Sequence, residues 1–261
     1  MTVKGFKIKN ITSTRLFLPI VSLILVLIIN MIKTPNFFNI TIQNGVFYGY
    51  IIDVINRASE LVILAVGMTL VVASSGGTDI SVGAVCALAG AVECFILAGG
   101  EVSTDVYRAP YIAAFIAAIF VGLLCGSFNA FLVAKMNIQP MVATLILFTA
   151  GRGMAQLVTN GQITYIRVES FRMLGNYIHG IPLPTPVFVA LAVVPVTLII
   201  LKKTALGLYI ETVGINNKAA RLVGLNPVYI QFIAYAFCGL LAGLAGIIVS
   251  SRVYSADANN A

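Results

Sequence analysis

The sequence predicts an all-α protein, a single transmembrane domain over residues 1–261 that is built as a polytopic helix bundle. Of its residues 59% are hydrophobic and 10% are charged, and the mean hydropathy is +1.00. Soluble domains hold about 45–50% apolar and about 25% charged residues. Several apolar runs reach the length of roughly 18 residues that is typical of a membrane span. Lysine and arginine also gather between alternate runs, as they do on the cytoplasmic side of membranes.

Seven spans are expected, and the basic residues orient them. A basic flank precedes the first span and places the N-terminus in the cytoplasm, and no small-residue cleavage site follows that span. An odd number of spans then leaves Ala261 outside the cell. The flank consists of Lys4, Lys7, Lys9 and Arg15. The expected spans are residues 16–32, 58–74, 80–98, 111–134, 141–158, 187–201 and 233–249.

The composition also excludes several classes of protein. Basic residues at the ends of spans account for the net charge of +7, so no nucleic-acid partner is expected. The four cysteines lie within apolar runs without metal-ligand spacing, and His179, the only histidine of the sequence, lies in a loop rich in proline and glycine. The sequence therefore predicts no catalytic residues, no metal site and no cofactor, and we expect that the chain is not an enzyme.

Residues 46–57 have two interpretations. Asp53 and Arg57 are four residues apart on one helical face, so they can neutralise each other on a helix at the membrane interface. Alternatively, this region and the residues after it line an outer vestibule. The vestibule residues would then be Asp53, Asn56, Arg57 and Glu60.

A polar elbow, SSGGTDI, joins the second and third expected spans. Gly76 and Gly77 permit backbone angles that other residues resist, so the chain can turn sharply there. Asp79 then stands at the start of the next helix, where a carboxylate can accept backbone N–H groups. We therefore expect the two spans to form a packed hairpin inside a larger bundle.

Small residues recur at helical spacing within the expected spans, which lets neighbouring helices approach closely. Gly122, Gly126 and Ala130 form such a ladder on one face of the fourth span. Gly239 and Gly243 form another ladder in the seventh span. We expect these faces to be helix contacts.

Residues 203–227 are too polar to span the membrane and contain the signals of a short helix. Asn216 is an expected N-cap of the segment NKAARLV, and Gly224 ends it. A helix this short is marginal alone, so it must rest against something. Ala219, Ala220, Leu222 and Val223 can insert into a cleft, while Lys218 and Arg221 point towards solvent or an acidic partner. The alternative is an amphipathic helix that lies on the lipid surface.

Three of these stretches resemble a known family. GMTLVVASSGGTDISVGA resembles a signature of bacterial ABC-type sugar permeases of the ribose and galactose group, and TALGLYIETVGINNKAARLVGLN is similar to their cytoplasmic coupling segment. CGLLAGLAGII is similar to the helix that follows, and DVINRAS resembles the branch associated with galactofuranose. Thr78 departs from the signature, which has an apolar residue there. The family also continues through a further hydrophobic region beyond SADANNA, so we expect a C-terminally incomplete chain.

The resemblance implies a monosaccharide permease in the bacterial plasma (inner) membrane, without chemistry of its own. Its expected partners are an ATP-binding cassette subunit, an extracytoplasmic sugar-binding protein, a second permease chain and the lipid bilayer. The residues expected to couple the loop to the ATPase are Gly214, Asn216, Ala219, Ala220 and Gly224. We expect Ala220→Glu to abolish ATP-driven uptake without preventing membrane insertion.

The translocation path is less well defined by the sequence. Polar residues within or beside the spans are candidates to line it, but each is also explained by a helix cap or a hydrogen bond between helices. The candidates are Asp79, Glu93, Asn129 and Gln156. Two other functions share the architecture: an ABC permease for a nucleoside or a branched-chain amino acid, and a secondary transporter with broken helices.

Overall fold

The computed structural model describes residues 17–34, 36–43, 45–178 and 180–258. The chain divides into two compact units, Met1–Val54 and Ile55–Ala261. The expected basic flank before the first span and the histidine of the proline-rich loop lie outside the described residues.

The first unit begins with helix α1 (Phe17–Lys33), in which no described residue is buried. An antiparallel hairpin of β1 (Thr41–Gln43) and β2 (Val46–Tyr48) follows. Helix α2 then starts at Tyr50, so residues 46–57 form a strand and the first turns of a long helix. Asp53 and Arg57 thus lie on the first turns of α2, and their position at the membrane interface stays a prediction.

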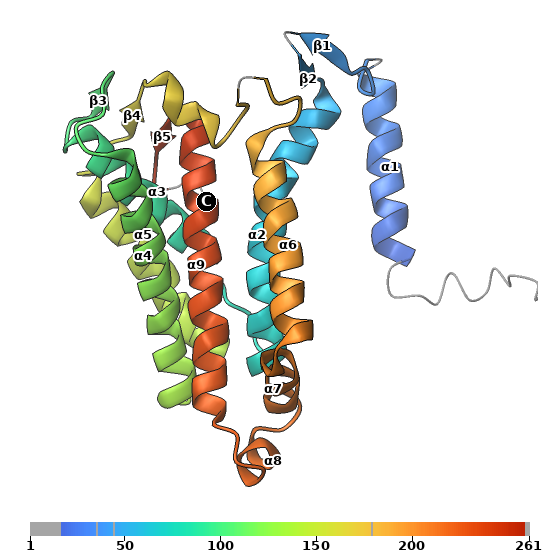
Figure 1. Cartoon of the computed structure of the whole chain (residues 1–261), viewed down its shortest axis with the longest axis vertical. Coiled ribbons are helices and arrows are strands. Elements are labelled where there is room, and N and C mark those ends of the chain that lie inside the picture. The colour runs from blue at the N-terminus through green and yellow to red at the C-terminus, as the bar shows by residue number, and fades with distance from the viewer. Residues whose placement is uncertain (1–16, 35, 44, 179, 259–261) are drawn as a thin grey trace, which may run out of the picture. The chain divides into compact units, whose positions relative to one another are not determined.

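The second unit is a bundle of helices, which Figure 1 shows with α3, α4, α5 and α9 close together and α2 beside α6. Two short segments are not α-helical. The π-helical turn η2 (Phe131–Lys135) continues α4, and the 3-10 helix η3 (Glu169–Met173) precedes α6. The bundle helices are α2 (Tyr50–Ser75), α3 (Val82–Ala98), α4 (Tyr111–Ala130), α5 (Pro140–Val158), α6 (Thr185–Lys203), α7 (Ala205–Ile215), α8 (Asn217–Leu222) and α9 (Pro227–Val253).

Among the described residues, five helices are long and apolar enough to cross a membrane by length and composition. These are α2, α4 with η2, α5, α6 and α9. Helices α1 and α3, of 17 residues each, are apolar but shorter. Exposed apolar side chains recur every three or four residues along α4 and into η2, as on a helix face turned to lipid. They are Ile112, Ile116, Phe120, Leu124, Phe128 and Phe131.

Helix α9 crosses α4 where glycines from both helices face each other. A Cβ atom added at Gly126 would lie 2.9 Å from the Cα of Gly239, and one added at Gly122 would lie 2.9 Å from the Cα of Gly243. These distances leave no room for side chains, so the expected ladders of small residues are confirmed as a close helix contact. Helix α3 is buried along most of its length.

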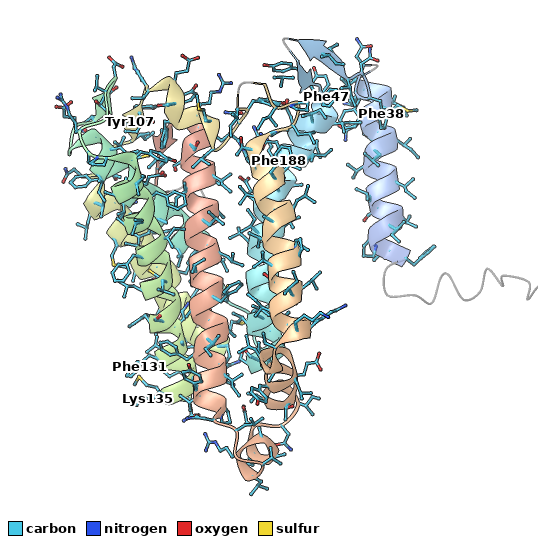
Figure 2. The ribbon with its side chains drawn as sticks, viewed as in Figure 1. Phe38, Phe47, Tyr107, Phe131, Lys135 and Phe188 are labelled. Atoms are coloured by element: carbon cyan, nitrogen blue, oxygen red, sulfur yellow. The ribbon has the colours of Figure 1, made fainter. Side chains whose placement is uncertain are left out.

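A small sheet gathers three segments at one end of the bundle. β3 (Ser103–Thr104) pairs in parallel with β4 (Thr164–Ile166), which pairs antiparallel with β5 (Ser255–Ala256). The sheet joins the loop after α3, the loop after α5 and the residues after α9. Figure 2 shows Tyr107 at this end of the bundle and Phe131 and Lys135 at the opposite end. The segments expected outside the membrane on one side therefore share one end of the second unit.

The opposite end holds α7 and α8, which occupy the segment expected as a polar loop. The Asn216 side chain accepts the backbone N–H groups of Lys218 and Ala219, both at 3.0 Å, so the expected N-cap is confirmed. Gly224 has a φ of 84°, which suits the stop after the helix. The expectation missed α7, which the structure shows as a helix of 11 residues.

Candidate functional site

The elbow between α2 and α3 places a carboxylate inside the bundle. Gly76 adopts a φ of 68°, a conformation that glycine reaches without strain, so the expected turn is present. The expected packed hairpin of the two spans is not formed, because α3 packs mainly on α4, α5 and α9 and not along α2. The carboxylate Oδ1 of Asp79 accepts the backbone N–H of Ser81 at 2.8 Å and its hydroxyl at 2.6 Å. Asp79 thus accepts a backbone N–H as expected, but Ser81 holds the N-cap position and α3 begins at Val82.

Asn129 of α4 joins this elbow. Its amide nitrogen donates to Asp79 Oδ2 at 3.2 Å and to Ser81 Oγ at 2.8 Å, and all three side chains are buried. The crevice beside them, which Gly126 and Gly239 also line, has no room for a water molecule. Two path candidates from distant parts of the sequence, Asp79 and Asn129, therefore meet in a closed polar cluster that ties α3 to α4.

The other two path candidates lie elsewhere. Glu93 is completely buried in α3, and its Oε2 accepts the hydroxyl of Ser250 from α9 at 2.7 Å. This contact fits the alternative of a hydrogen bond between helices. Gln156 is exposed on α5 and is not part of either cluster. The structure thus brings together only two of the four candidates.

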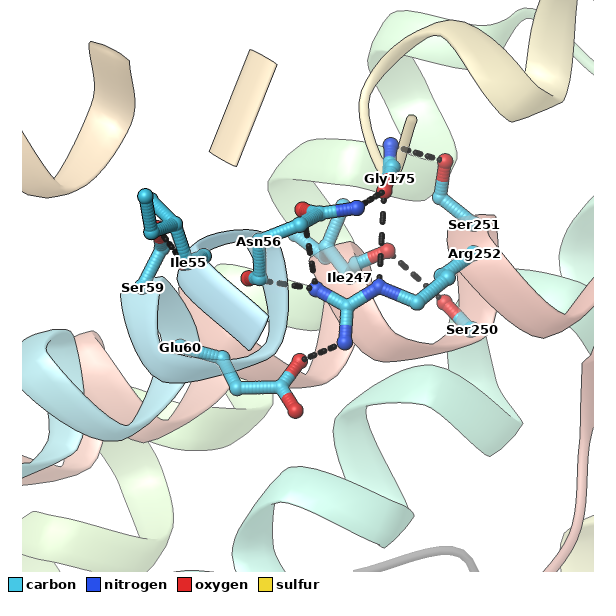
Figure 3. A network of polar contacts seen from close by, with 9 residues as sticks. All are labelled: Ile55, Asn56, Ser59, Glu60, Gly175, Ile247, Ser250, Ser251 and Arg252. Carbon is cyan, nitrogen blue, oxygen red and sulfur yellow. Dashed lines mark hydrogen bonds and ion pairs between the residues drawn. The ribbon is translucent and has the colours of Figure 1, made fainter. Parts of the chain in front are cut away.

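At the other end of α2, an arginine of α9 organises the polar residues that Figure 3 shows. Arg252 Nη1 lies 2.8 Å from Glu60 Oε2, and Nη2 donates to the carbonyl oxygen of Asn56 at 3.1 Å. Arg252 Nε donates to the carbonyl oxygen of Gly175 at 3.4 Å. Ser251 Oγ accepts the backbone N–H of Gly175 at 2.8 Å. The guanidinium group thus joins α2, α9 and the loop after η3.

The residues expected to line an outer vestibule differ in how far they are exposed. Asn56 is buried and Glu60 is mostly covered, and both contact Arg252. Asp53 and Arg57 are exposed on α2. The sequence interpretation missed Arg252. Lysine and arginine are normally in excess on the cytoplasmic side, so a cation in a segment expected outside was a signal that could have identified it.

The short helix α8 presents different side chains than the sequence interpretation assumed. Ala220 is completely buried and packs in a cluster with Leu70, Ile210, Val213, Ile230 and Ala234, so it faces its own bundle. Asn216, Ala219 and Gly224 are exposed. Leu222 is 89% exposed and Val223 is 72% exposed. Of the residues expected to insert into a cleft, Ala220 thus packs into its own bundle, whereas Leu222 and Val223 face away from it.

Three contacts fix the last turn of α2 to the helices that carry α8. A Cβ atom at Gly214 of α7 would overlap the carbonyl oxygen of Ala73, so these backbones touch. Gln231 Nε2 of α9 donates to the carbonyl oxygen of Ser74 at 3.2 Å. The hydroxyl groups of Tyr235 and Ser75 lie 3.1 Å apart. The elbow that bears Asp79 follows directly after this turn.

The long apolar helices and the apolar outer face of the bundle fit a multi-pass membrane protein. The family model described as "Branched-chain amino acid transport system / permease component" matches residues 50–261. The chain belongs to this family of permeases.

Curated relatives agree with the family. The chain is 43% identical over 242 residues to the galactofuranose transporter permease protein YtfT of Escherichia coli, covering 93% of this chain and 68% of the relative. It is 38% identical to the ribose import permease protein RbsC of Escherichia coli, covering 91% and 70%. It is 35% identical to the fructose import permease protein FruF of Bifidobacterium longum, covering 96% and 69%. No solved structure matches the chain.

Proposed function

We propose that the chain is the membrane permease subunit of an ATP-driven importer of a monosaccharide. The observation that carries this proposal is the identity of 43% to a galactofuranose permease over 93% of the chain. The ribose and fructose import permeases among the relatives support a sugar as the cargo. We infer no chemical step for this chain, and we assign ATP hydrolysis to a separate ATP-binding cassette subunit.

The proposed partners follow from the same importer assembly. An extracytoplasmic binding protein delivers the sugar at the end that holds the small sheet, and two permease chains, alike or unlike, share the path. The chain lies in the bacterial inner membrane with its N-terminus and α8 on the cytoplasmic side. The lysines at the end of α6, Lys202 and Lys203, support this orientation because basic residues favour the cytoplasmic side.

Coupling, in this proposal, runs from α8 to the elbow. The ATPase grips the segment from Asn216 to Gly224, and closure of the ATPase moves it. Ala220 packs on α7 and α9, and Gly214 touches α2 at Ala73, so a displacement of α8 bears on the turn that precedes the elbow. Such a displacement changes transport only if ATP binding favours one of the two states of the bundle.

The path itself is proposed to pass the cluster of Asp79 and Asn129. Both side chains carry groups that recognise sugar hydroxyls, and they lie beside the glycines of the α4–α9 crossing. Because the crevice is closed here, passage of a sugar requires α9 to move away from α4. Glu93, Gln156 and the exposed residues of the outer end, Asp53 and Arg57, are secondary candidates for contact with cargo.

Transport by liposomes tests the proposal. The chain is purified with the ATP-binding and sugar-binding proteins encoded beside it, and uptake of labelled ribose, fructose and galactofuranose is measured with and without ATP inside the vesicles. We expect uptake of at least one sugar that requires both ATP and the binding protein. Uptake that ignores ATP but follows a proton gradient contradicts the proposal and favours a secondary transporter.

A second cargo class is favoured by one observation, the family description that names branched-chain amino acids. Competition distinguishes the two cargoes in the same assay. If an excess of unlabelled leucine blocks uptake of the labelled cargo and an excess of unlabelled sugar does not, the chain is assigned to amino-acid transport.

A further inference from the structure

Helix α5 carries a row of polar side chains on a surface that is otherwise apolar. Thr149, Arg152 and Gln156 follow one another at intervals of three and four residues, so they share one side of the helix. Thr149 and Gln156 are exposed, and Arg152 is half-buried. The large apolar residues exposed on α5 are Met141, Val142, Leu145, Ile146, Met154 and Leu157. We call Thr149, Arg152 and Gln156 the polar stripe of α5.

The guanidinium group of Arg152 has no polar partner within the described residues. Neither of the two ion pairs found there includes it, and its Nε is buried without a hydrogen bond. Its Cζ lies over the ring of Phe148 instead, 4.5 Å from the ring centroid. A cation is attracted to the face of an aromatic ring, but this contact leaves the N–H donors of the guanidinium unused.

The guanidinium lies near the middle of α5. Phe148 stands eight residues after Pro140 and ten residues before Val158, the two ends of the helix. At about 1.5 Å per residue, these distances along the helix are about 12 Å and about 15 Å. Arg152 thus leans away from the nearer end of α5, whereas an arginine that reaches a lipid headgroup leans towards it. A cation at this depth in a membrane faces a water-filled space or another polar group.

A second copy of this chain offers no free acid to Arg152 at this depth. Three of the nine acidic residues lie within or beside the expected spans, and each of them contacts other residues of its own bundle. These three are Glu60, Asp79 and Glu93. The other six acidic residues lie outside the expected spans. Water and the molecule that passes through it are therefore the partners left for the guanidinium.

We propose that the polar stripe of α5 lines the water-filled path, where Arg152, held over Phe148, donates hydrogen bonds to hydroxyl groups of the monosaccharide. A guanidinium offers several donors in a rigid plane, and an aromatic ring beside a few polar groups is typical of small-molecule sites. This inference rests on the proposed function and adds a specific cargo contact to it. The same helix also contacts the elbow, because Thr144 Oγ1 accepts the backbone N–H of Ile80 at 3.1 Å.

Cysteine labelling tests whether the stripe faces water. A thiol reacts as its thiolate, which forms in water and not in lipid. The full chain is assembled in nanodiscs with the ATP-binding and sugar-binding proteins encoded beside it, and is treated with a charged methanethiosulfonate that does not enter lipid. Intact-protein mass spectrometry measures the rate of labelling. The four native cysteines are buried, so wild type gives the background.

Met154→Cys is the matched control for the labelling. Met154 is exposed only two residues from Arg152, so it lies at nearly the same depth but about 200° around the helix. We expect Arg152→Cys and Gln156→Cys to react at least about tenfold faster than Met154→Cys. We also expect an excess of the imported sugar to slow the labelling of Gln156→Cys, which retains Arg152. Stripe variants that react as slowly as Met154→Cys, or labelling of Gln156→Cys that ignores the sugar, overturn the inference.

Uptake into liposomes gives the second readout. We expect Arg152→Gln to lower uptake at saturating sugar at least about tenfold, the effect of losing one hydrogen bond from a charged donor, with an unchanged midpoint of thermal unfolding. Arg152→Lys keeps the charge without the planar fork and should lose less. Lys135→Gln is the control, because Lys135 also lies over an aromatic ring, that of Phe131, but is exposed at the end of η2. We expect its uptake to equal that of wild type.

The remaining outcomes separate the sources of failure. If wild type imports sugar with ATP and Arg152→Gln does so equally well, only the assignment of Arg152 fails. If Arg152→Gln prevents two permease chains from purifying together, Arg152 holds an acid of an unlike second chain and the inference is wrong. If wild type imports no sugar with ATP and its binding protein, the proposed function fails and the inference fails with it.

Discussion

The ion pair between Glu60 and Arg252 allows a quantitative prediction for Glu60→Gln. The pair spans 2.8 Å, and its side chains are only 18% and 11% exposed. Removing one member of a buried pair costs about 3–5 kcal/mol, because the other charge is left uncompensated. Since both side chains retain some contact with water and the amide can still accept one hydrogen bond, we expect a loss of about 2 kcal/mol.

The control is the exposed pair of Glu101 and Arg108. It has nearly the same separation, 2.9 Å, but its side chains are 51% and 57% exposed. Exposed pairs contribute about 0–1 kcal/mol, so Glu101→Gln has little effect. Thermal unfolding in detergent, followed by circular dichroism, compares the two variants. At about 2–4 °C per kcal/mol for a chain of this size, Glu60→Gln lowers the midpoint by about 4–8 °C.

The reasoning also predicts coupling between the two residues of the buried pair. In a double-mutant cycle with Arg252→Gln, the second substitution costs less once the first is present, because the charge it leaves is no longer unpaired. Glu60→Gln and Glu101→Gln with equal midpoints, or strictly additive effects in the cycle, would refute the assignment of Arg252 as the residue that holds this end together.

Three other predictions concern the helix crossing, the elbow and α8. Gly239→Leu places a side chain against the backbone of α4, so we expect loss of the folded protein on size-exclusion chromatography, whereas Gly153→Leu, where nothing lies within 4 Å, is tolerated. Asn129→Ala removes both donors to the elbow, and we expect about 1–3 kcal/mol lower stability and reduced uptake, measured on the same preparation. Ala220→Glu puts a charge into a fully buried position, so we expect α8 to detach from α7 and α9 and ATP-driven uptake to stop. Membrane fractionation checks that the variant is inserted normally. Normal uptake by Ala220→Glu would exclude α8 from the mechanism.

The helical class and the closely packed glycine faces of α4 and α9 followed from the sequence, because both depend on local composition, but the pairing of these two faces did not. Apolar runs determine which segments are buried in lipid or protein, and glycine spacing of four residues determines which helix face can be approached. The elbow followed for the same reason, since Gly76 and Gly77 mark a turn whatever surrounds them. Segment ends were less accurate: α9 starts at Pro227 and ends at Val253, beyond both ends of the expected span.

The orientation of α8 could not be read from its own residues. In NKAARLV the small side chains of Ala219 and Ala220 are adjacent, and a helix turns by about 100° between them, so only one can face the bundle. Which of the two alanines faces the bundle depends on α7 and α9, because Ala220 packs against Val213 of α7 and Ile230 of α9. Those partners are defined by the tertiary packing. The same packing exposes Leu222 and Val223, which a simple apolar-inside rule would have buried.

The role of Arg252 shows which sequence signal merits more weight in chains of this kind. Its partners, Asn56, Glu60 and Gly175, come from distant segments, so no spacing rule connects them. Yet a cation near the end of an apolar run, on the side where cations are scarce, must be compensated or face solvent. Glu60, an acid at the edge of another expected span, needs compensation as well. Pairing such unexplained charges of opposite sign across the expected bundle would have predicted the contact between Glu60 and Arg252 from the sequence alone. The midpoint of thermal unfolding of Glu60→Gln tests whether this ion pair is as strong as that argument requires.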